Sequence, residues 1–100
     1  MSDVKSLVQS YIKDNTIMVF SKSYCPYCRR VKDLFTKLGL TYKVIELDQV
    51  DQGSDIQNYL AELTKQRTVP NVFVKGKHIG GCTETMEANK SGYLTTLLNN

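Results

Sequence analysis

The first half of the chain alternates between the apolar patterns of a strand, a helix and a second strand, and this order restricts the possible folds most. Residues Ile17–Phe20 are all apolar, as in a strand that is buried on both faces. From Pro26 onward, apolar residues recur at helical spacing as far as Leu38, and Gly39 provides a helix stop. Residues 42–47 are again rich in residues that favour strands. This order predicts two parallel strands joined by a crossover helix.

The remaining elements are placed by the same periodicities and by turn residues. A first helix is expected before the Ile17 strand, with Ser2 or Asp3 as its N-terminal cap. Gly76-Lys77 is expected to form a hairpin turn. The expected elements are helix 4–12, strand 17–20, helix 26–38, strand 42–47, a helix from Ser54 or Asp55, strand 71–75, strand 78–79, a short helix from near Thr83 and a last helix after Gly92. They predict an α/β fold, with a four-stranded mixed sheet flanked by about five helices, in a single domain over residues 1–100.

Length and composition exclude several classes of protein. One hundred residues suffice for one compact core, and 41% hydrophobic with 23% charged residues is typical of a globular chain. The first ten residues show no secretory pattern, and no stretch approaches the roughly 20 apolar residues of a membrane span. A net charge of +3 is too small to indicate nucleic acid. We therefore expect a cytoplasmic protein that binds neither membranes nor nucleic acid.

The chain has three cysteines, and two of them form the pair Cys25 and Cys28. In a reducing compartment such a pair is usually a redox centre or half of a metal site. Pro26 suits the first helical position, which places Cys25 at the helix start, where unpaired N–H groups stabilise an anionic sulfur. Cys28 falls on the inward face of the same helix, three residues before Val31. We expect Cys25 to be an exposed nucleophile and Cys28 a buried resolving thiol.

The positive charge around this pair supports a thiolate. Lys22, Arg29, Arg30 and Lys32 all lie within a few residues of the two cysteines in the sequence. Cationic neighbours stabilise a thiolate and so favour thiol–disulfide exchange.

A zinc site is the competing interpretation of the pair. His78 and Cys82 would complete a set of three cysteines and one histidine with Cys25 and Cys28. A zinc knuckle usually turns after its second cysteine, whereas here the helical pattern continues through Val31. We therefore favour the redox interpretation, and expect His78 to be an ordinary hairpin residue.

Three motifs, in order along the chain, resemble those of the glutaredoxin family. They are Cys25-Pro26-Tyr27-Cys28, Thr68-Val69-Pro70 and Gly80-Gly81-Cys82. The resemblance to dithiol glutaredoxins covers essentially the whole chain and implies a thioredoxin-like fold with a cis peptide bond before Pro70. The sibling thioredoxins typically carry Trp-Cys-Gly-Pro-Cys, which this chain lacks.

The resemblance also implies a site for glutathione. In this family the backbone of the residue before the cis-proline, here Val69, pairs with the cysteine of glutathione as an added strand would. Glu84 stands where the family often has Asp. The residues that the resemblance places at glutathione are Lys22, Tyr27, Gln57, Arg67, Thr68, Val69, Pro70, Cys82, Thr83 and Glu84.

The function expected from this resemblance is the reduction of protein–glutathione mixed disulfides and protein disulfides. Glutathione is the reducing cosubstrate, with no tightly bound cofactor and no metal, and the chain is expected to act as a monomer on glutathionylated or disulfide-containing proteins. An iron–sulfur carrier that bridges two chains is the alternative, which Pro26 disfavours because cluster-binding relatives tend to have a smaller residue there. A reductase fed by a flavoprotein, as thioredoxin is, is a third possibility. Cys82 is expected to be a small buried hydrophobic residue without a role, or else a regulatory thiol that oxidises or links two chains.

Overall fold

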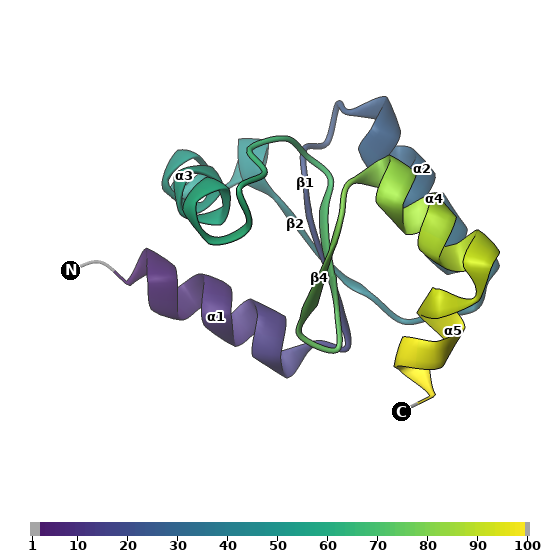
Figure 1. Ribbon diagram of the computed structural model, residues 1–100. Coiled ribbons are helices and arrows are strands. Elements are labelled where there is room, and N and C mark those ends of the chain that lie inside the picture. The colour runs from purple at the N-terminus through teal and green to yellow at the C-terminus, as the bar shows by residue number, and fades with distance from the viewer. Residues whose placement is uncertain (1–2, 100) are drawn as a thin grey trace.

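The computed structural model describes residues 3–99, which form helices and strands in the expected order (Figure 1). Pro26 is the first residue of its helix, and a left-handed Gly39 (φ 73°) follows the C-terminal end of that helix, as expected. The elements are α1 (Val4–Asp14), β1 (Ile17–Ser21), α2 (Pro26–Lys37), β2 (Lys43–Glu46), a 3₁₀ turn η1 (Leu47–Gln49), α3 (Gly53–Thr64), β3 (Asn71–Val74), β4 (Lys77–Gly80), α4 (Cys82–Ser91) and α5 (Tyr93–Leu98). No helix within residues 3–99 is long and apolar enough to cross a membrane.

The strands within residues 3–99 form one mixed sheet of four strands in the order β2-β1-β3-β4. β1 and β2 are parallel, with Val19 opposite Val44, and α2 is the crossover between them. β1 pairs antiparallel with β3, and β3 pairs antiparallel with β4. The parallel pair and the hairpin confirm the mixed sheet expected from the sequence.

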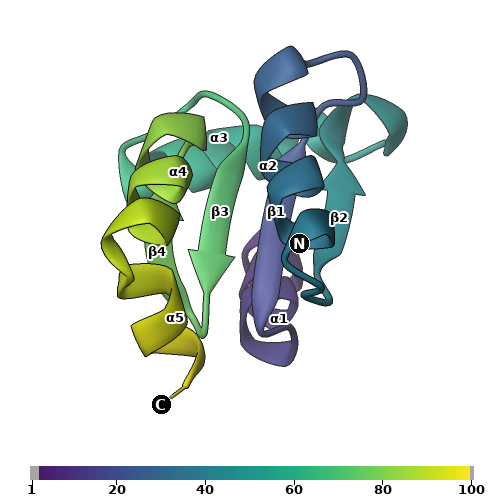
Figure 2. The ribbon, with the colours of Figure 1, turned by 90° about the vertical axis from the view of Figure 1, so that its right-hand side faces the viewer.

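Helices cover both faces of this sheet, with α1 and α3 on one side and α2, α4 and α5 on the other (Figures 1 and 2). Side chains alternate along a strand, so neighbouring residues of β1 enter different cores. Met18 and Phe20 pack with α1 and α3, whereas Ile17 and Val19 pack with α2, α4 and α5. This double coverage explains why β1 is a continuous apolar run.

Several helix boundaries differ slightly from those expected. Asp3 precedes α1 but its side chain makes no capping hydrogen bond, and Ser2, the other expected cap, lies outside the described residues. α3 begins at Gly53, one residue before Ser54. A Cβ atom on Gly53 would lie 1.8 Å from the carbonyl oxygen of Leu47, so this helix start packs closely against η1. α4 begins at Cys82, one residue before Thr83.

The hairpin turn was also misplaced by one residue. The turn consists of Lys75 and Gly76, and Lys77 already begins β4. Lys75 and Gly76 both have positive φ, 53° and 80°. Two such residues match the twist of a two-residue hairpin. Lysine rarely adopts this conformation, so the identity of Lys75 gives no signal that the turn begins there.

Candidate active site

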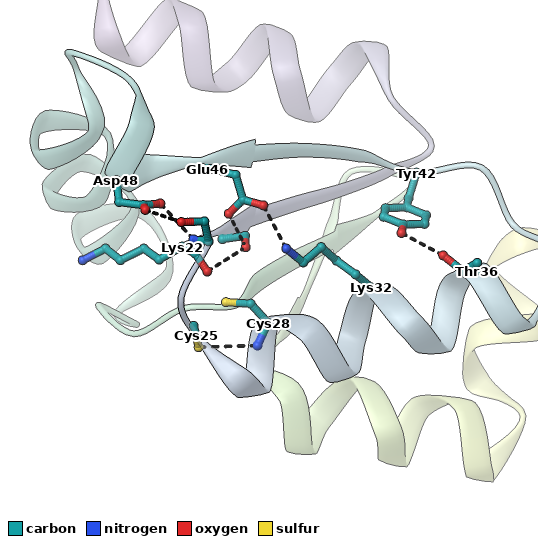
Figure 3. A network of polar contacts seen from close by, with 10 residues as sticks. Lys22, Cys25, Cys28, Lys32, Thr36, Tyr42, Glu46 and Asp48 are labelled. Atoms are coloured by element: carbon teal, nitrogen blue, oxygen red, sulfur yellow. Dashed lines mark hydrogen bonds and ion pairs between the residues drawn. The ribbon is translucent and has the colours of Figure 1, made fainter.

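Cys25 lies between β1 and α2 and is the N-terminal cap of α2 (Figure 3). Its N–H donates to the carbonyl oxygen of Lys22 at 3.0 Å, which closes the turn after β1. Its Sγ is half-buried and accepts the N–H of Cys28 at 3.4 Å. Pro26 brings no N–H of its own to the first turn. The sulfur therefore occupies the place where a helix start stabilises negative charge.

Cys28 sits one turn further on and is completely buried. Burial raises the pKa of its thiol from 9.0 to about 11, although hydrogen bonds with the Lys22 backbone and the Ser21 side chain act in the opposite direction. At neutral pH roughly one Cys28 in 10,000 is ionised at that pKa. The two cysteines therefore differ in access and in environment, as the helical phase predicted.

A polar network anchors the base of this site (Figure 3). The hydroxyl of Ser21, fully buried at the end of β1, donates to Glu46 Oε1 at 2.7 Å. The other carboxylate oxygen of Glu46 pairs with Lys32 Nζ at 2.8 Å. These contacts join β1, β2 and α2, so they fix the helix that carries both cysteines relative to the sheet.

Asp48 holds the turn that precedes Cys25. The N–H of Ser23 donates to Asp48 Oδ1 at 2.9 Å, and the hydroxyl of Ser23 donates to Oδ2. These hydrogen bonds, together with a smaller contribution from the charge of Lys22, lower the pKa of the Asp48 carboxyl. The acidic side chain is thus a fixed acceptor for the turn, and its charge lies close to Lys22.

The loop before β3 brings Val69 to the nucleophilic sulfur. Cys25 Sγ lies 3.8 Å from the carbonyl oxygen of Val69, and the peptide bond between Val69 and Pro70 is cis, as the resemblance implied. One side chain spans this loop: Gln66 Nε2 donates to the carbonyl oxygens of Thr68 at 3.1 Å and of Pro70 at 3.0 Å. The carbonyls on both sides of Val69 therefore face Gln66, while that of Val69 faces Cys25.

Gln57 and Arg67, both expected at one end of glutathione, are neighbours. Gln57 Nε2 donates to the carbonyl oxygen of Arg67 at 2.8 Å. The guanidinium of Arg67 donates to Asn58 Oδ1 at 2.9 Å. α3 thus supports the start of the Val69 loop through its side chains.

The start of α4 forms the other side of the site. A Cβ atom on Gly81 would lie 3.5 Å from the carbonyl oxygen of Pro70, so this helix start lies against the Val69 loop. Thr85 donates the first helical hydrogen bond, to Gly81, which leaves the N–H groups of Cys82 and Thr83 outside the helical pattern. Glu84 accepts the N–H of Gly81 at 2.8 Å, so its carboxylate caps its own helix.

Comparison with known proteins identifies the family. The family model described as Glutaredoxin matches residues 17–79. The chain belongs to the glutaredoxin family. Glutaredoxin-C1 of Arabidopsis thaliana is 53% identical over 98 residues, covering 98% of this chain and 75% of the relative. The glutaredoxin of Ricinus communis is 55% identical over 98 residues, covering 98% of this chain and 92% of the relative.

Solved structures agree with this assignment. A buckwheat glutaredoxin–glutathione complex superposes with a TM-score of 0.93 at 50% identity, covering 96% of this chain and 87% of that one. The expected thioredoxin-like fold is therefore confirmed. As a member of the glutaredoxin family, the protein is a glutathione-dependent thiol–disulfide oxidoreductase.

In this glutaredoxin the start of α2 and the Val69 loop meet at the Cys25 sulfur, and the start of α4 lies against the Val69 loop. Tyr27 is 58% exposed beside them, and the charge of Lys22 contributes to the lowered pKa of the Asp48 carboxyl. Within residues 3–99, no group of three or more His, Cys, Asp or Glu side chains is arranged to hold a metal ion. His78 instead shares a hydrogen bond of 2.8 Å with Asn71.

Two features of the site are not predictable from the sequence. The first is the network around Ser21 and Glu46, whose only signal is a polar residue that ends an apolar strand. The second is Gln66, which stands in a polar loop where nothing in the sequence distinguishes it from its neighbours.

Proposed function

We propose that this glutaredoxin removes glutathione from protein–glutathione mixed disulfides, with Cys25 as the nucleophile. The observation that supports this assignment is the difference between its two thiols. Cys25 is accessible and receives an N–H at a helix start, whereas Cys28 is buried with its pKa raised to about 11. The thiolate is the attacking species in disulfide exchange, so the accessible sulfur at the helix start attacks first.

The reaction proceeds by two exchanges. The Cys25 thiolate attacks the glutathione sulfur, which breaks the mixed disulfide, forms a Cys25–glutathione disulfide and releases the protein thiolate. A second glutathione thiolate then attacks the glutathione sulfur of that disulfide. It releases the Cys25 thiolate and oxidised glutathione, so two glutathione moieties leave joined and the protein thiol is reduced.

The proposed glutathione site lies between the Val69 loop and the start of α4. The backbone N–H and carbonyl of Val69 pair with the cysteine residue of glutathione, supported by the 3.8 Å approach of this carbonyl to Cys25 Sγ. The N–H groups of Cys82 and Thr83 suit a carboxylate. The complex of a buckwheat glutaredoxin with glutathione supports a site of this kind. Around these contacts we place the flanking side chains of Lys22, Tyr27, Gln57, Arg67, Thr68, Pro70 and Glu84.

Of the side chains proposed to contact glutathione, that of Glu84 also caps its own helix. Its carboxylate already accepts the Gly81 N–H. A carboxylate has two oxygens and several acceptor positions, so a glutathione amine would share it with the helix cap.

Cys28 takes part when the substrate is a protein disulfide. Attack by Cys25 then forms a disulfide with the target protein, and Cys28 loses its proton and attacks Cys25. This releases the target as a dithiol and leaves a Cys25–Cys28 disulfide, which two glutathione molecules reduce. We also propose that the protein acts as a monomer in the cytoplasm, where a reducing environment keeps the three thiols free.

Serine variants test this division of roles. Cys25→Ser should abolish the release of glutathione from a glutathionylated peptide, because the other cysteine at the start of α2, Cys28, is buried. Cys28→Ser should keep that activity but lose the reduction of a protein disulfide. Both activities are measured with glutathione and glutathione reductase, following NADPH consumption. Activity retained in Cys25→Ser would overturn the assignment, as would equal loss of both activities in Cys28→Ser.

A further inference from the structure

A pocket beside the proposed glutathione site is lined partly by Cys25 and by none of the residues proposed for glutathione. It has a volume of about 510 Å³ and is lined by Ser23, Tyr24, Cys25, Pro26, Arg29 and Arg30. The substrate of the proposed function is a disulfide with two halves, one of glutathione and one of protein. The proposed glutathione site and this pocket both adjoin Cys25. One can therefore bind the glutathione half of the disulfide while the other binds the protein half.

The charge in this pocket comes from two arginines without partners. Of the four cations near the cysteine pair, Lys32 is paired with Glu46. Lys22 belongs to the proposed glutathione site and interacts with the charge of Asp48 without forming an ion pair within residues 3–99. Arg29 and Arg30 are exposed, and neither side chain forms an ion pair or a hydrogen bond within residues 3–99. Asp33, one turn further along α2, is paired with neither.

These two arginines lie where the dipole of α2 does not favour a cation. They are the fourth and fifth residues of α2, and its first turn contains no acidic residue. A helix N-terminus carries partial positive charge, so cations near it are unfavourable and acids are favoured. The chain thus concentrates positive charge beside the reacting sulfur against the preference of the helix, which is the arrangement expected of an anion-binding surface.

Tyr24 adds a contact surface to this charge. It is 71% exposed, the largest value among the exposed large hydrophobic residues within the described part of the chain. Exposed tyrosines and arginines are the residue types most enriched where proteins bind partners. Together they define a surface for a polypeptide rather than for a small anion.

We propose that this pocket binds the target polypeptide next to its disulfide and selects targets with acidic residues beside the reacting cysteine. The proposal rests on the proposed function, and adds the class of protein substrate to it. The acidic side chains would face Arg29 and Arg30, while the neighbouring backbone lies along Tyr24.

Two glutathionylated peptides test this selectivity. They share one sequence, except that the residues beside the modified cysteine are Asp in one and Lys in the other. A third substrate, the mixed disulfide of glutathione with 2-mercaptoethanol, has no flanking residues. The readout is the ratio of kcat/KM for the acidic peptide to that for the basic peptide within each variant, so a general change in Cys25 reactivity cancels.

The test variant is Arg29→Gln with Arg30→Gln, and the control is Lys37→Gln with Lys43→Gln. Lys37 and Lys43 are exposed, at the C-terminal end of α2 and the N-terminal end of β2. The control therefore removes the same charge at positions away from the start of α2. The wild type should prefer the acidic peptide, and the arginine variant should lose about fivefold or more of that ratio, as expected for two surface ion pairs. The control should keep the ratio, and added salt should lower it in the wild type.

Each other result contradicts a specific claim. Equal rates for both peptides in the wild type, a ratio unchanged in the arginine variant, or an equal loss in the control would overturn the inference and leave the proposed function intact. A wild type that reduces none of the three substrates would overturn the proposed function instead, and the selectivity with it. Charge reversal, Arg29→Glu with Arg30→Glu, should invert the preference, and an unchanged preference there also overturns the inference.

Discussion

Replacing Gln66 by alanine should weaken substrate binding as well as folding, although Gln66 touches neither thiol. Its amide group donates to the carbonyls of Thr68 and Pro70, at 3.1 and 3.0 Å. These carbonyls flank Val69, whose own carbonyl lies 3.8 Å from Cys25 Sγ. No other side chain within residues 3–99 donates a hydrogen bond to these two carbonyls, so without the amide they are free to turn toward the sulfur.

The size of the effect follows from the number of bonds lost. Each hydrogen bond contributes about 0.5–1.5 kcal/mol, and water can replace part of a half-exposed pair, so Gln66→Ala should cost about 1–2 kcal/mol. For a domain of this length that lowers Tm by roughly 5–10 °C. A loop that is ordered only part of the time binds more weakly, so KM for a glutathionylated peptide should rise about fivefold, which is on the order of 1 kcal/mol.

Thermal unfolding and steady-state kinetics of three variants measure both effects. Gln66→Glu keeps the size of the side chain but cannot donate when ionised, so it should resemble or exceed Gln66→Ala. Gln9→Ala is the matched control, since it removes an exposed glutamine with one hydrogen bond, to Tyr59. A lower Tm with an unchanged KM would show that Gln66 is merely structural. Normal KM and Tm in Gln66→Glu would refute the reasoning entirely.

Three further predictions concern Cys28 and Gly53. Because burial raises the pKa of Cys28 to about 11, only about one Cys28 in 1,000 is ionised near pH 8. Iodoacetamide should therefore modify Cys25 well before Cys28. Peptide mapping that finds equal rates of modification would contradict this prediction. A thiol pKa raised on folding stabilises the protein fully below the unfolded value of 9.0, and this contribution is lost as pH rises through about 11. The difference in unfolding free energy between the wild type and Cys28→Ser should therefore fall by about 2 kcal/mol between about pH 8 and pH 11 in urea titrations, and a constant difference would argue against the shift. Gly53→Ala would place Cβ 1.8 Å from the Leu47 carbonyl oxygen and should cost about 1–3 kcal/mol in urea unfolding, whereas Ser54→Ala, its exposed neighbour, should change little.

The sequence predicted those parts of the site that depend on local periodicity. Pro26 marked the helix start, and the spacing of Cys28 from Val31 predicted its burial, because both depend on residues within one or two helical turns. The family resemblance, rather than any local pattern, predicted the cis bond before Pro70.

Contacts between distant segments were not predictable in the same way. Ser21 and Glu46 are 25 positions apart and meet because β1 and β2 pair in parallel with these two residues opposite each other. That register is set where β1 and β2 pair and α2 packs on one face of the sheet, which no periodicity specifies. Gln66 acts through backbone carbonyls, which carry no sequence identity, so its role is visible only in the folded loop.

The burial of Cys28 also determines how the enzyme divides its intermediate between two thiols. Burial is the largest cause of the raised pKa and does not depend on the state of Cys25, so the pKa of Cys28 stays raised when Cys25 is in a disulfide. Glutathione has an ordinary thiol, with a pKa near 8.5, and is therefore ionised about 300 times more often than Cys28 at any pH below that value. Both thiolate populations rise tenfold per pH unit in this range, so their ratio does not change with pH. The partition between the two routes then follows the concentration of glutathione, and Cys28 captures more of the intermediate only as that concentration falls.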